Sequence, residues 1–166
     1  MKDILIKDIR NFVMLGHTGS GKTTLGDALL LKLGLNDRMG SVATGTSAID
    51  FTEEEIARKL SIYSKPFCGV FKSKSGKKLQ LSFIDTPGYD DFLGQVIPAL
   101  RASDLALLVV DALSGMQVGT QRAWRMASAS NKPRAVVITG GDRENADFNK
   151  VLEQIQSSWG TKCLPA

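Results

Sequence analysis

The feature that most constrains how this 166-residue chain folds is an octapeptide near its start, Gly-His-Thr-Gly-Ser-Gly-Lys-Thr at residues 16–23. It matches the pattern GxxxxGK[ST] in full, in which glycines let successive backbone N–H groups point inward at phosphate oxygens. An apolar run at residues 12–15 precedes it, and an amphipathic pattern over residues 22–33 follows it and stops at Gly34. This order of strand, loop and helix predicts a phosphate-binding loop whose following helix directs its dipole at the phosphates.

The residues of this loop have expected roles. Lys22 reaches the β- and γ-phosphates, and the hydroxyl of Thr23 is a ligand for Mg²⁺. His17 is the only histidine of the chain, and we interpret it as a structural part of the loop because it has no partner for a metal site. The predicted nucleotide-binding residues of this region are Gly16, His17, Thr18, Gly19, Ser20, Gly21, Lys22, Thr23 and Thr24.

A second motif, Asp85-Thr86-Pro87-Gly88, comes directly after an apolar run at residues 81–84. A carboxylate at the end of a strand can hold Mg²⁺ through water, so Asp85 joins Thr23 as a predicted metal-binding residue. The N–H of Gly88 can bond a γ-phosphate and register its loss on hydrolysis, which makes Gly88 a candidate catalytic residue beside Lys22. The DxxG pattern alone is usually a turn, but after a phosphate loop and a strand it indicates a nucleotide site.

Strand-like and helix-like segments alternate along the chain. Apolar runs predict strands at residues 12–15, 66–71, 79–84, 105–110 and 134–139, and 3.6-residue patterns predict helices at 22–33, 118–130 and 148–159. A further helix over residues 92–100 contains Pro98, so we expect it to be bent or shortened. Residues 36–65 are polar and turn-rich, which is typical of a functional or mobile segment. The alternation predicts an α/β fold of three layers, α/β/α, with a mostly parallel sheet.

Composition excludes several classes of protein. The hydrophobic fraction of 43% and the charged fraction of 23% are those of an average soluble globular protein, and no apolar stretch has the length of a membrane span. Cys68 and Cys163 lack a CxxC partner, which argues against a disulfide framework or a zinc site and fits a reducing cytosol. The one lysine cluster is interpreted as a hairpin tip around Gly76. We therefore predict a soluble, cytoplasmic monomer that binds neither DNA nor a membrane.

With these motifs in place, residues 9–163 resemble the translational GTPases, and most closely elongation factor G or its divergent paralogues. GHTGSGKTTL is similar to that family's phosphate loop, DTPGYDDF to its second switch, and DRENADF, residues 142–148, to its base-recognition loop and the helix after it. The resemblance implies a Ras-like G domain with switches at about residues 36–65 and 85–98. It implies that Ser61 completes the Mg²⁺ shell.

The same resemblance implies a cofactor and a partner. GTP and GDP with Mg²⁺ are the expected cofactors, and the expected activity is GTP hydrolysis on the ribosome, slow without that activator. The family's G domain continues into a last strand and a last helix that this chain lacks. We therefore expect residues 1–166 to be a single G domain from the N-terminal part of a longer factor.

Departures from the family bear on the chemistry. Gly19 stands where these factors usually have aspartate, and Ser61 where they have threonine. Tyr89 stands where the family has the histidine that orients the attacking water. A neutral phenol can hydrogen-bond water but is a poor base, so Tyr89 is a candidate catalytic residue of reduced efficiency.

The largest departure concerns base recognition. The family reads guanine with an NKxD motif, and this chain has Thr139-Gly140-Gly141-Asp142 as the corresponding nucleotide-binding residues. Asp142 can still accept from the guanine edge, whereas the first two positions lose the contacts of asparagine and lysine. We therefore expect weakened base selectivity, and expect Thr139→Asn with Gly140→Lys to tighten GDP binding more than ADP binding.

Two other functions remain open at this point. One is a nucleotide-gated binding module with little hydrolysis, favoured by Tyr89, and the other is a P-loop NTPase with relaxed base specificity. We expect residues 36–65 to be displaced from the loop without nucleotide, because Ser61 then has no Mg²⁺ to face. Within that segment Asp50, Glu53, Glu54 and Glu55 are interpreted as a charged surface or the start of a short helix.

Overall fold

The most apolar segments of the chain become the interior strands of a sheet. The computed structural model describes residues 4–165, with strands β1 (Ile9–Leu15), β2 (Lys65–Lys72), β3 (Lys78–Asp85), β4 (Leu105–Asp111) and β5 (Arg134–Thr139). Their order is β2-β3-β1-β4-β5, in which β2 and β3 are antiparallel and every other pair is parallel. Both faces are covered over the second half of β1 and most of β4, which is why residues 12–15 and 105–110 read as continuous apolar runs.

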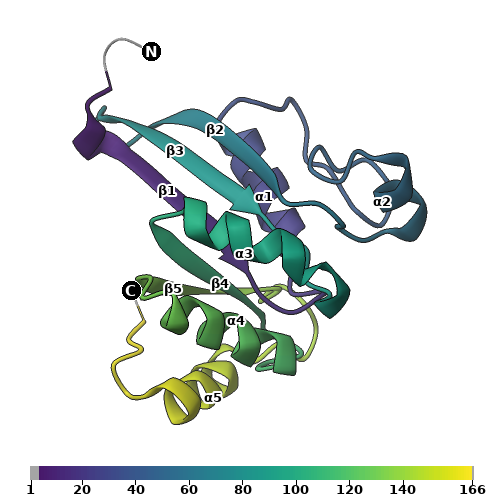
Figure 1. Cartoon of the computed structure of the whole chain (residues 1–166), viewed down its shortest axis with the longest axis vertical. Helices are drawn as coiled ribbons and strands as arrows, with labels where there is room; N and C mark the ends of the chain where they lie inside the picture. Colours follow the sequence, from purple (N-terminus) through teal and green to yellow (C-terminus); the bar gives the residue numbers. More distant parts are fainter. Residues whose placement is uncertain (1–3, 166) are drawn as a thin grey trace.

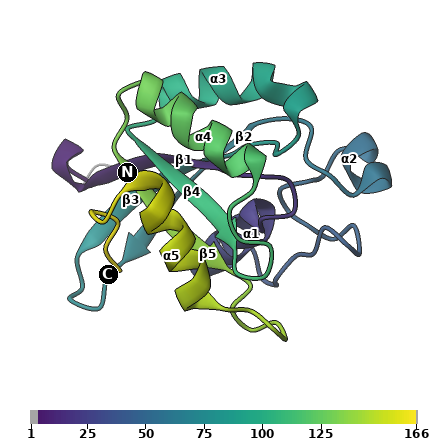
Figure 2. The same cartoon turned by 90° about the horizontal axis from the view of Figure 1, so that it is seen from below.

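Helices lie on both faces of this sheet (Figure 1). The main helices are α1 (Lys22–Lys32), α3 (Leu93–Ala102), α4 (Val118–Ala129) and α5 (Phe148–Trp159), and the shorter elements are α2 (Glu53–Arg58) and 3-10 turns at Ile6–Asp8 and Asp90–Phe92. α1 packs through Leu30 on the face that carries Met14 and Phe83, whereas α3, α4 and α5 cover the opposite face (Figure 2). The predicted three-layer α/β/α fold with a mostly parallel sheet is therefore confirmed.

The helix around Pro98, which the sequence predicted to be bent or shortened, is not shortened. α3 runs without interruption from Leu93 to Ala102. Pro98 is its sixth residue, so the helix loses only the bond that this N–H would make to the carbonyl of Gly94. Burial of Val96 and Leu100 against the sheet holds the remaining turns in place.

The hairpin formed by β2 and β3 confirms the interpretation of the lysine cluster. Its turn spans residues 73–77, with Gly76 at φ +82°, and the Lys77 ammonium lies 2.6 Å from the Asp8 carboxylate. The register pairs Lys65 with Asp85 at the other end of the hairpin. Across residues 4–165, no helix combines the length and the apolar character that a membrane span requires.

Candidate functional site

The predicted phosphate loop joins the buried end of β1 to the first turn of α1. Gly16 packs so closely that a Cβ there would lie 2.4 Å from the carbonyl oxygen of Val109. Gly21 precedes the helix in the left-handed region, at φ +81°. The glycines of the motif are thus required by the backbone itself, and the N-terminus of α1 opens onto the space beyond the loop.

Lys22 is almost completely buried inside the curve of this loop. Its Nζ donates to the carbonyl oxygens of His17, at 2.8 Å, and Gly16, at 3.2 Å. Burial lowers the pKa of Lys22 to about 8, although the nearby carboxylates of Asp85 and Asp50 oppose that shift. A buried ammonium that no carboxylate among the described residues contacts directly is a site that an anion would complete.

Gly88 lies against the same loop from the other side. A Cβ at this position would be 2.6 Å from the backbone nitrogen of Thr18 and 2.7 Å from Nζ of Lys22. Only glycine fits such an approach, so the DxxG segment and the phosphate loop meet through their backbones. The predicted juxtaposition of Gly88 and Lys22 is therefore present in the structure.

Thr23 stands at the centre of a chain of hydroxyl and carboxylate groups. Its Oγ1 donates to Oδ2 of Asp85 at 2.9 Å and lies 2.9 Å from Oγ of Ser61, which in turn donates to Oδ2 of Asp50 at 2.9 Å. The two hydroxyls and the two carboxylates therefore form one hydrogen-bonded chain, with the hydroxyl oxygens 2.9 Å apart. Such a group of oxygen atoms is the kind of ligand set that a hard cation such as Mg²⁺ prefers.

The two carboxylates of this chain of groups are themselves unusual. Asp85 and Asp50 are buried, and the Oδ1 atom of each lacks a hydrogen-bond partner among residues 4–165. Burial raises the pKa of Asp85 to about 7, against the opposing effects of Lys22 and the Thr23 hydroxyl, and burial likewise raises the pKa of Asp50. A divalent cation at this position would favour the ionised form of both groups.

The donor set fits Mg²⁺ in a particular way. Residues 4–165 contain no group of three or more His, Cys, Asp or Glu side chains that could hold a metal ion. Mg²⁺ commonly binds through one or two carboxylates and water, completed by substrate phosphates. Two hydroxyls, a carboxylate and an adjacent phosphate loop match that mode of binding.

Residues 36–64 lie over the loop and bring Ser61 within 2.9 Å of Thr23, and their displacement in the nucleotide-free domain stays a prediction. The buried carboxylate of Glu55 pairs with Lys65 and accepts from the backbone N–H groups of Ile62, at 3.0 Å, and Tyr63, at 3.2 Å. The hydroxyl of Ser64 donates to the backbone of α3 at 2.9 Å. These contacts of Glu55 and Ser64 fix the 36–64 segment over the loop and place Ser61 next to Thr23.

The acidic group in this segment is only partly what the sequence suggested. Thr52 and Glu55 form a capping box at the start of α2, which confirms the predicted short helix. Asp50 and Glu55, however, are buried rather than part of a charged surface. Both lie beside Lys65, whose Nζ is 3.5 Å from Oδ1 of Asp50. One lysine thus balances two buried carboxylates.

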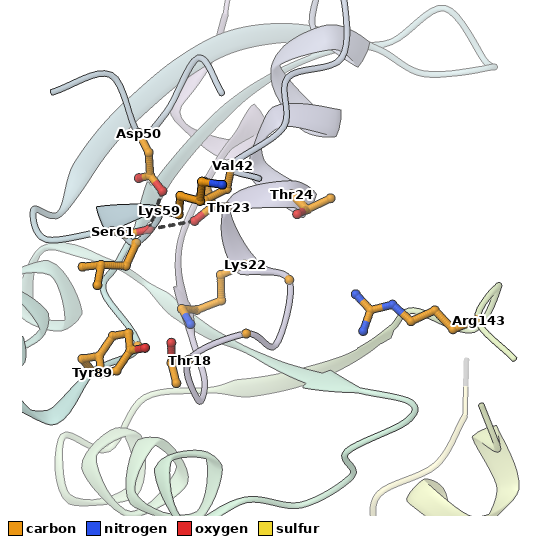
Figure 3. A pocket seen from close by; sticks show the side chains of 14 residues that line it. Thr18, Lys22, Thr23, Thr24, Val42, Asp50, Lys59, Ser61, Tyr89 and Arg143 are labelled. Atoms are coloured by element: carbon orange, nitrogen blue, oxygen red, sulfur yellow. Dashed lines mark hydrogen bonds between the residues drawn. The ribbon is translucent and has the colours of Figure 1, made fainter. Parts of the chain in front are cut away.

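Tyr89 follows Gly88 at the rim of the site. Its side chain is 42% exposed, and its hydroxyl end points into the cavity on the side of Thr18 and Lys22 (Figure 3). The next residue, Asp90, forms a two-pronged ion pair with Arg122 of α4. The residues on both sides of Tyr89 are therefore anchored, Gly88 by its close approach to Thr18 and Asp90 by its ion pair, whereas the Tyr89 side chain itself stays partly exposed.

At the end of β5, residues 139 and 140 differ from the sequence interpretation. Thr139 keeps a bridging contact, because its hydroxyl donates to the carbonyl oxygen of Ser20 at 2.7 Å. Gly140 has φ +70°, and a Cβ there would lie 2.7 Å from Oδ1 of Asp111. A lysine would therefore be strained at position 140, which argues against the expected benefit of Gly140→Lys for GDP binding.

The phosphate loop, the 36–64 segment and the Gly88–Tyr89 segment surround an open cavity of about 350 Å³, a size typical of small-molecule sites. Nine of the site residues predicted from the sequence line this cavity: Thr18, Gly19, Gly21, Lys22, Thr23, Thr24, Ser61, Gly88 and Tyr89. The predicted residues Gly16, His17, Ser20, Asp85, Thr139, Gly140, Gly141 and Asp142 do not line it. Sequence reasoning missed Val42, Asp50, Lys59, Leu60 and Arg143 as lining residues. Lys59 and Leu60 had a local signal in their position beside Ser61, and Arg143 had one in its position beside Asp142.

Comparisons with known proteins agree with this geometry. Residues 7–163 match the family described as the elongation factor Tu GTP binding domain. An elongation factor G-like protein of Mycobacterium tuberculosis is 38% identical over 161 residues, covering 95% of this chain and 21% of that protein. A crystal structure of a Thermus thermophilus protein superposes with a TM-score of 0.84 at 39% identity, covering 92% of this chain and 22% of that one.

The chain spans about a fifth of the length of these relatives. Within that span, the family match covers all five strands and the residues that line the cavity. The matched relatives share over a third of its residues across nearly its whole length. The chain therefore belongs to the family of elongation factor Tu GTP-binding domains.

Proposed function

We propose that this domain binds GTP and GDP with Mg²⁺ and hydrolyses GTP. The observation that carries the proposal is the group of oxygen ligands formed by Thr23, Ser61 and Asp85. The Thr23 and Ser61 hydroxyls lie in the same cavity as the buried ammonium of Lys22. Oxygen ligands beside a buried ammonium suit a metal–phosphate ligand better than a neutral one.

The roles of the chain's own residues follow from their places in the cavity. Thr23 and Ser61 would hold Mg²⁺ directly and Asp85 through water, and the metal would supply charge neutralisation between the phosphates. Lys22 would neutralise the β- and γ-phosphates. Gly88, with its backbone fixed against Thr18, would donate its N–H to the terminal phosphate.

Tyr89 would orient the attacking water from the rim of the cavity. A phenol remains neutral near pH 7, where it can donate and accept a hydrogen bond but is a poor general base. Hydrolysis by the isolated domain is therefore slow, and an activator that excludes water and fixes Tyr89 would accelerate it. Family membership supports the ribosome as that activator in the longer proteins of this family.

The same contacts supply a switch. Residues 36–65 reach the site through Ser61, and residues 85–98 through Gly88. Both contacts lie where a terminal phosphate and its metal would be bound, so loss of that phosphate would release both segments. We assign these ranges as the two switches of the domain.

Two measurements test the proposal. Binding of labelled GDP, GTP and ATP, with and without Mg²⁺, should show tighter binding of the guanine nucleotides and a dependence on Mg²⁺. Single-turnover hydrolysis of GTP, with and without ribosomes, should be slow alone and faster with ribosomes. Equal binding of GDP and ATP would contradict the assignment as a guanine-nucleotide domain.

Tyr89 favours a second candidate, a GTP-gated binding module that barely hydrolyses its ligand. Its side chain is partly exposed at the rim of the cavity, and a neutral phenol there is a poor base. The same single-turnover assay decides between the two functions. A rate that ribosomes do not raise, with intact GTP binding, would support the binding module.

A further inference from the structure

The segment at residues 139–143 contributes a single side chain to the cavity wall among the described residues, that of Arg143. In Figure 3, Arg143 and Tyr89 stand at opposite ends of the cavity, with Lys22 between them. The guanidinium end of Arg143 points toward the phosphate loop. Besides Lys22 and Lys59, the described lining of the cavity thus includes a third cationic side chain, and this one is distant from the hydroxyl pair of Thr23 and Ser61.

A buried carboxylate fixes the position of this guanidinium. Nη1 of Arg143 donates to Oδ1 of Asp111 at 3.0 Å. The other oxygen of Asp111 accepts from the N–H and the hydroxyl of Ser114, at 3.0 and 2.7 Å, so the carboxylate cannot rotate freely. The side chain of Asp111 is 5% exposed and that of Arg143 53% exposed. One edge of the guanidinium is therefore anchored while much of its surface stays open.

Gly140 provides the room in which Arg143 lies. A Cβ on Gly140 would be 3.4 Å from Nε and 3.5 Å from Cζ of Arg143, as well as 2.7 Å from Oδ1 of Asp111. A Cβ at 140 would therefore be in van der Waals contact with the guanidinium and would clash with the carboxylate that anchors it. The absence of a side chain at 140 and the position of Arg143 are thus two parts of one arrangement.

We propose that Arg143 stacks its guanidinium plane on the purine ring of the bound nucleotide. This inference rests on the proposed function, because a nucleotide with its phosphates at Lys22 and Thr23 extends its base away from Tyr89, toward Arg143. A guanidinium is planar, weakly hydrated and stacks well on aromatic faces. Stacking is tolerant of the kind of base, since every base has a π-face.

This tolerance gives the proposal a specific signature. Arg143 adds affinity for guanine and adenine nucleotides alike, and it adds nothing for a ligand without a base. Guanine selectivity is then left to hydrogen-bonding groups such as Asp142, which is exposed and separate from the anchored arginine. Affinity for the base and discrimination between bases are carried by different residues.

The test compares Arg143→Ala, Arg143→Lys and the unaltered chain, with Arg125→Ala as a matched control that removes the same charge from α4, outside the cavity. Calorimetry measures the dissociation constants of GDP, ADP and pyrophosphate, each with Mg²⁺. Arg143→Ala should weaken GDP and ADP by a similar factor of about ten, equivalent to about 1.4 kcal/mol. Pyrophosphate binding and the control should be unchanged, and Arg143→Lys should recover only a minor part of the loss.

Each other result overturns the proposal. A similar loss of pyrophosphate affinity would mean that Arg143 contacts the phosphates. Full recovery by Arg143→Lys would mean that only its charge matters. No loss for either nucleotide would mean that Arg143 does not contact the ligand. The last result, with tight GDP binding by the unaltered chain, leaves the proposed function intact. Equal affinity of the unaltered chain for GDP and ADP would instead contradict the guanine-nucleotide assignment, independently of what Arg143→Ala does.

Discussion

The hydroxyl of Thr139 donates to the carbonyl oxygen of Ser20 at 2.7 Å and so joins the end of β5 to the phosphate loop. The same hydroxyl oxygen lies 3.2 Å from the carbonyl oxygen of Val110. Thr139 also lies close to Gly21, because a Cβ at position 21 would be 3.3 Å from the Thr139 hydroxyl oxygen. The shape of the loop therefore depends on a residue far along the chain.

Thr139→Val should loosen the phosphate loop. Valine keeps the shape of threonine but leaves the Ser20 carbonyl without its donor, which should lower the free energy of unfolding by about 1–2 kcal/mol. GDP affinity should fall with it, because the loop N–H groups lose their fixed directions. Urea denaturation and calorimetry measure the two effects. Thr139→Ser, which restores the hydroxyl, is the control and should bind GDP almost as well as the natural chain.

Lys22→Met should abolish nucleotide binding and leave the fold intact. Lys22 is a buried ammonium whose pKa is lowered to about 8 by that burial, so its charge destabilises the nucleotide-free domain at neutral pH. Methionine fills the same space without the charge. The melting temperature without nucleotide should therefore not fall, whereas the stabilisation by GDP should disappear. Lys32→Met, at the exposed end of the same helix, should keep that stabilisation; GDP binding retained by Lys22→Met would refute the phosphate-loop assignment.

Tyr89→His should raise ribosome-stimulated GTP hydrolysis by on the order of tenfold or more, since imidazole orients water and titrates near neutral pH. Single-turnover kinetics with saturating GTP measure the change. Tyr63 offers a matched control, because it is exposed to a similar degree, 45% against 42% for Tyr89, and does not line the cavity. A gain in Tyr63→His as large as in Tyr89→His would mean that the position has no special role.

The stability of the nucleotide-free domain should depend on Asp85 between about pH 4 and 7. The pKa of this carboxyl is raised by burial to about 7 in the folded state from 3.8, so the folded state holds its proton over a range in which the unfolded chain has lost it. The contribution of Asp85 to the free energy of unfolding therefore decreases as pH rises through this window, by on the order of 4 kcal/mol in total.

Asp85→Asn should remove that slope, as chemical denaturation at several pH values would show. Asp90→Asn is the control. The ion pair with Arg122 lowers the pKa of Asp90, so its contribution is present above pH 4 and is lost only in more acidic solution. An unaltered slope in Asp85→Asn would show that other groups carry the pH dependence.

Thr139→Asn combined with Gly140→Lys should weaken GDP binding rather than tighten it. The lysine would have to adopt φ near +70° and its Cβ would press on Asp111, which should cost about 1–2 kcal/mol of stability and displace Arg143. Differential binding of GDP and ADP, together with thermal unfolding, tests this. Tighter binding of GDP alone would show that the loop can rearrange around the lysine.

The fold and the phosphate loop could be predicted because their signals are local. An apolar run, a glycine loop and an amphipathic helix stand next to each other at residues 12–33, and the DxxG motif follows a strand directly. The spacing of such motifs is fixed by backbone geometry and needs no knowledge of distant residues. Strand and helix positions therefore agree closely with the structure.

The contacts between distant segments could not be predicted in this way. Ser61 and Thr23 are 38 residues apart, and the family resemblance, not the local sequence, placed them at one Mg²⁺ site. Thr139 and Ser20 are 119 residues apart, and nothing in either local sequence indicates their contact. Burial of Asp50 depends on the path of residues 36–64 over α1, for which the sequence shows no periodicity. The position of Arg143 depends on the missing side chain at Gly140 and on the carboxylate of Asp111.

The register of the β2–β3 hairpin limits how the domain can move. Eight residue pairs run from Lys65 with Asp85 to Lys72 with Lys78. The start of β2, which follows Ser61, and the end of β3, which precedes Gly88, therefore lie side by side at the same edge of the sheet. A slip by one residue would turn Lys65 away from Glu55 and reverse every side chain of β2. The 36–64 segment therefore cannot leave Thr23 by sliding. Release of Ser61 from Thr23 therefore requires the segment to turn about Lys65, the first residue of β2, while the hairpin keeps its pairing.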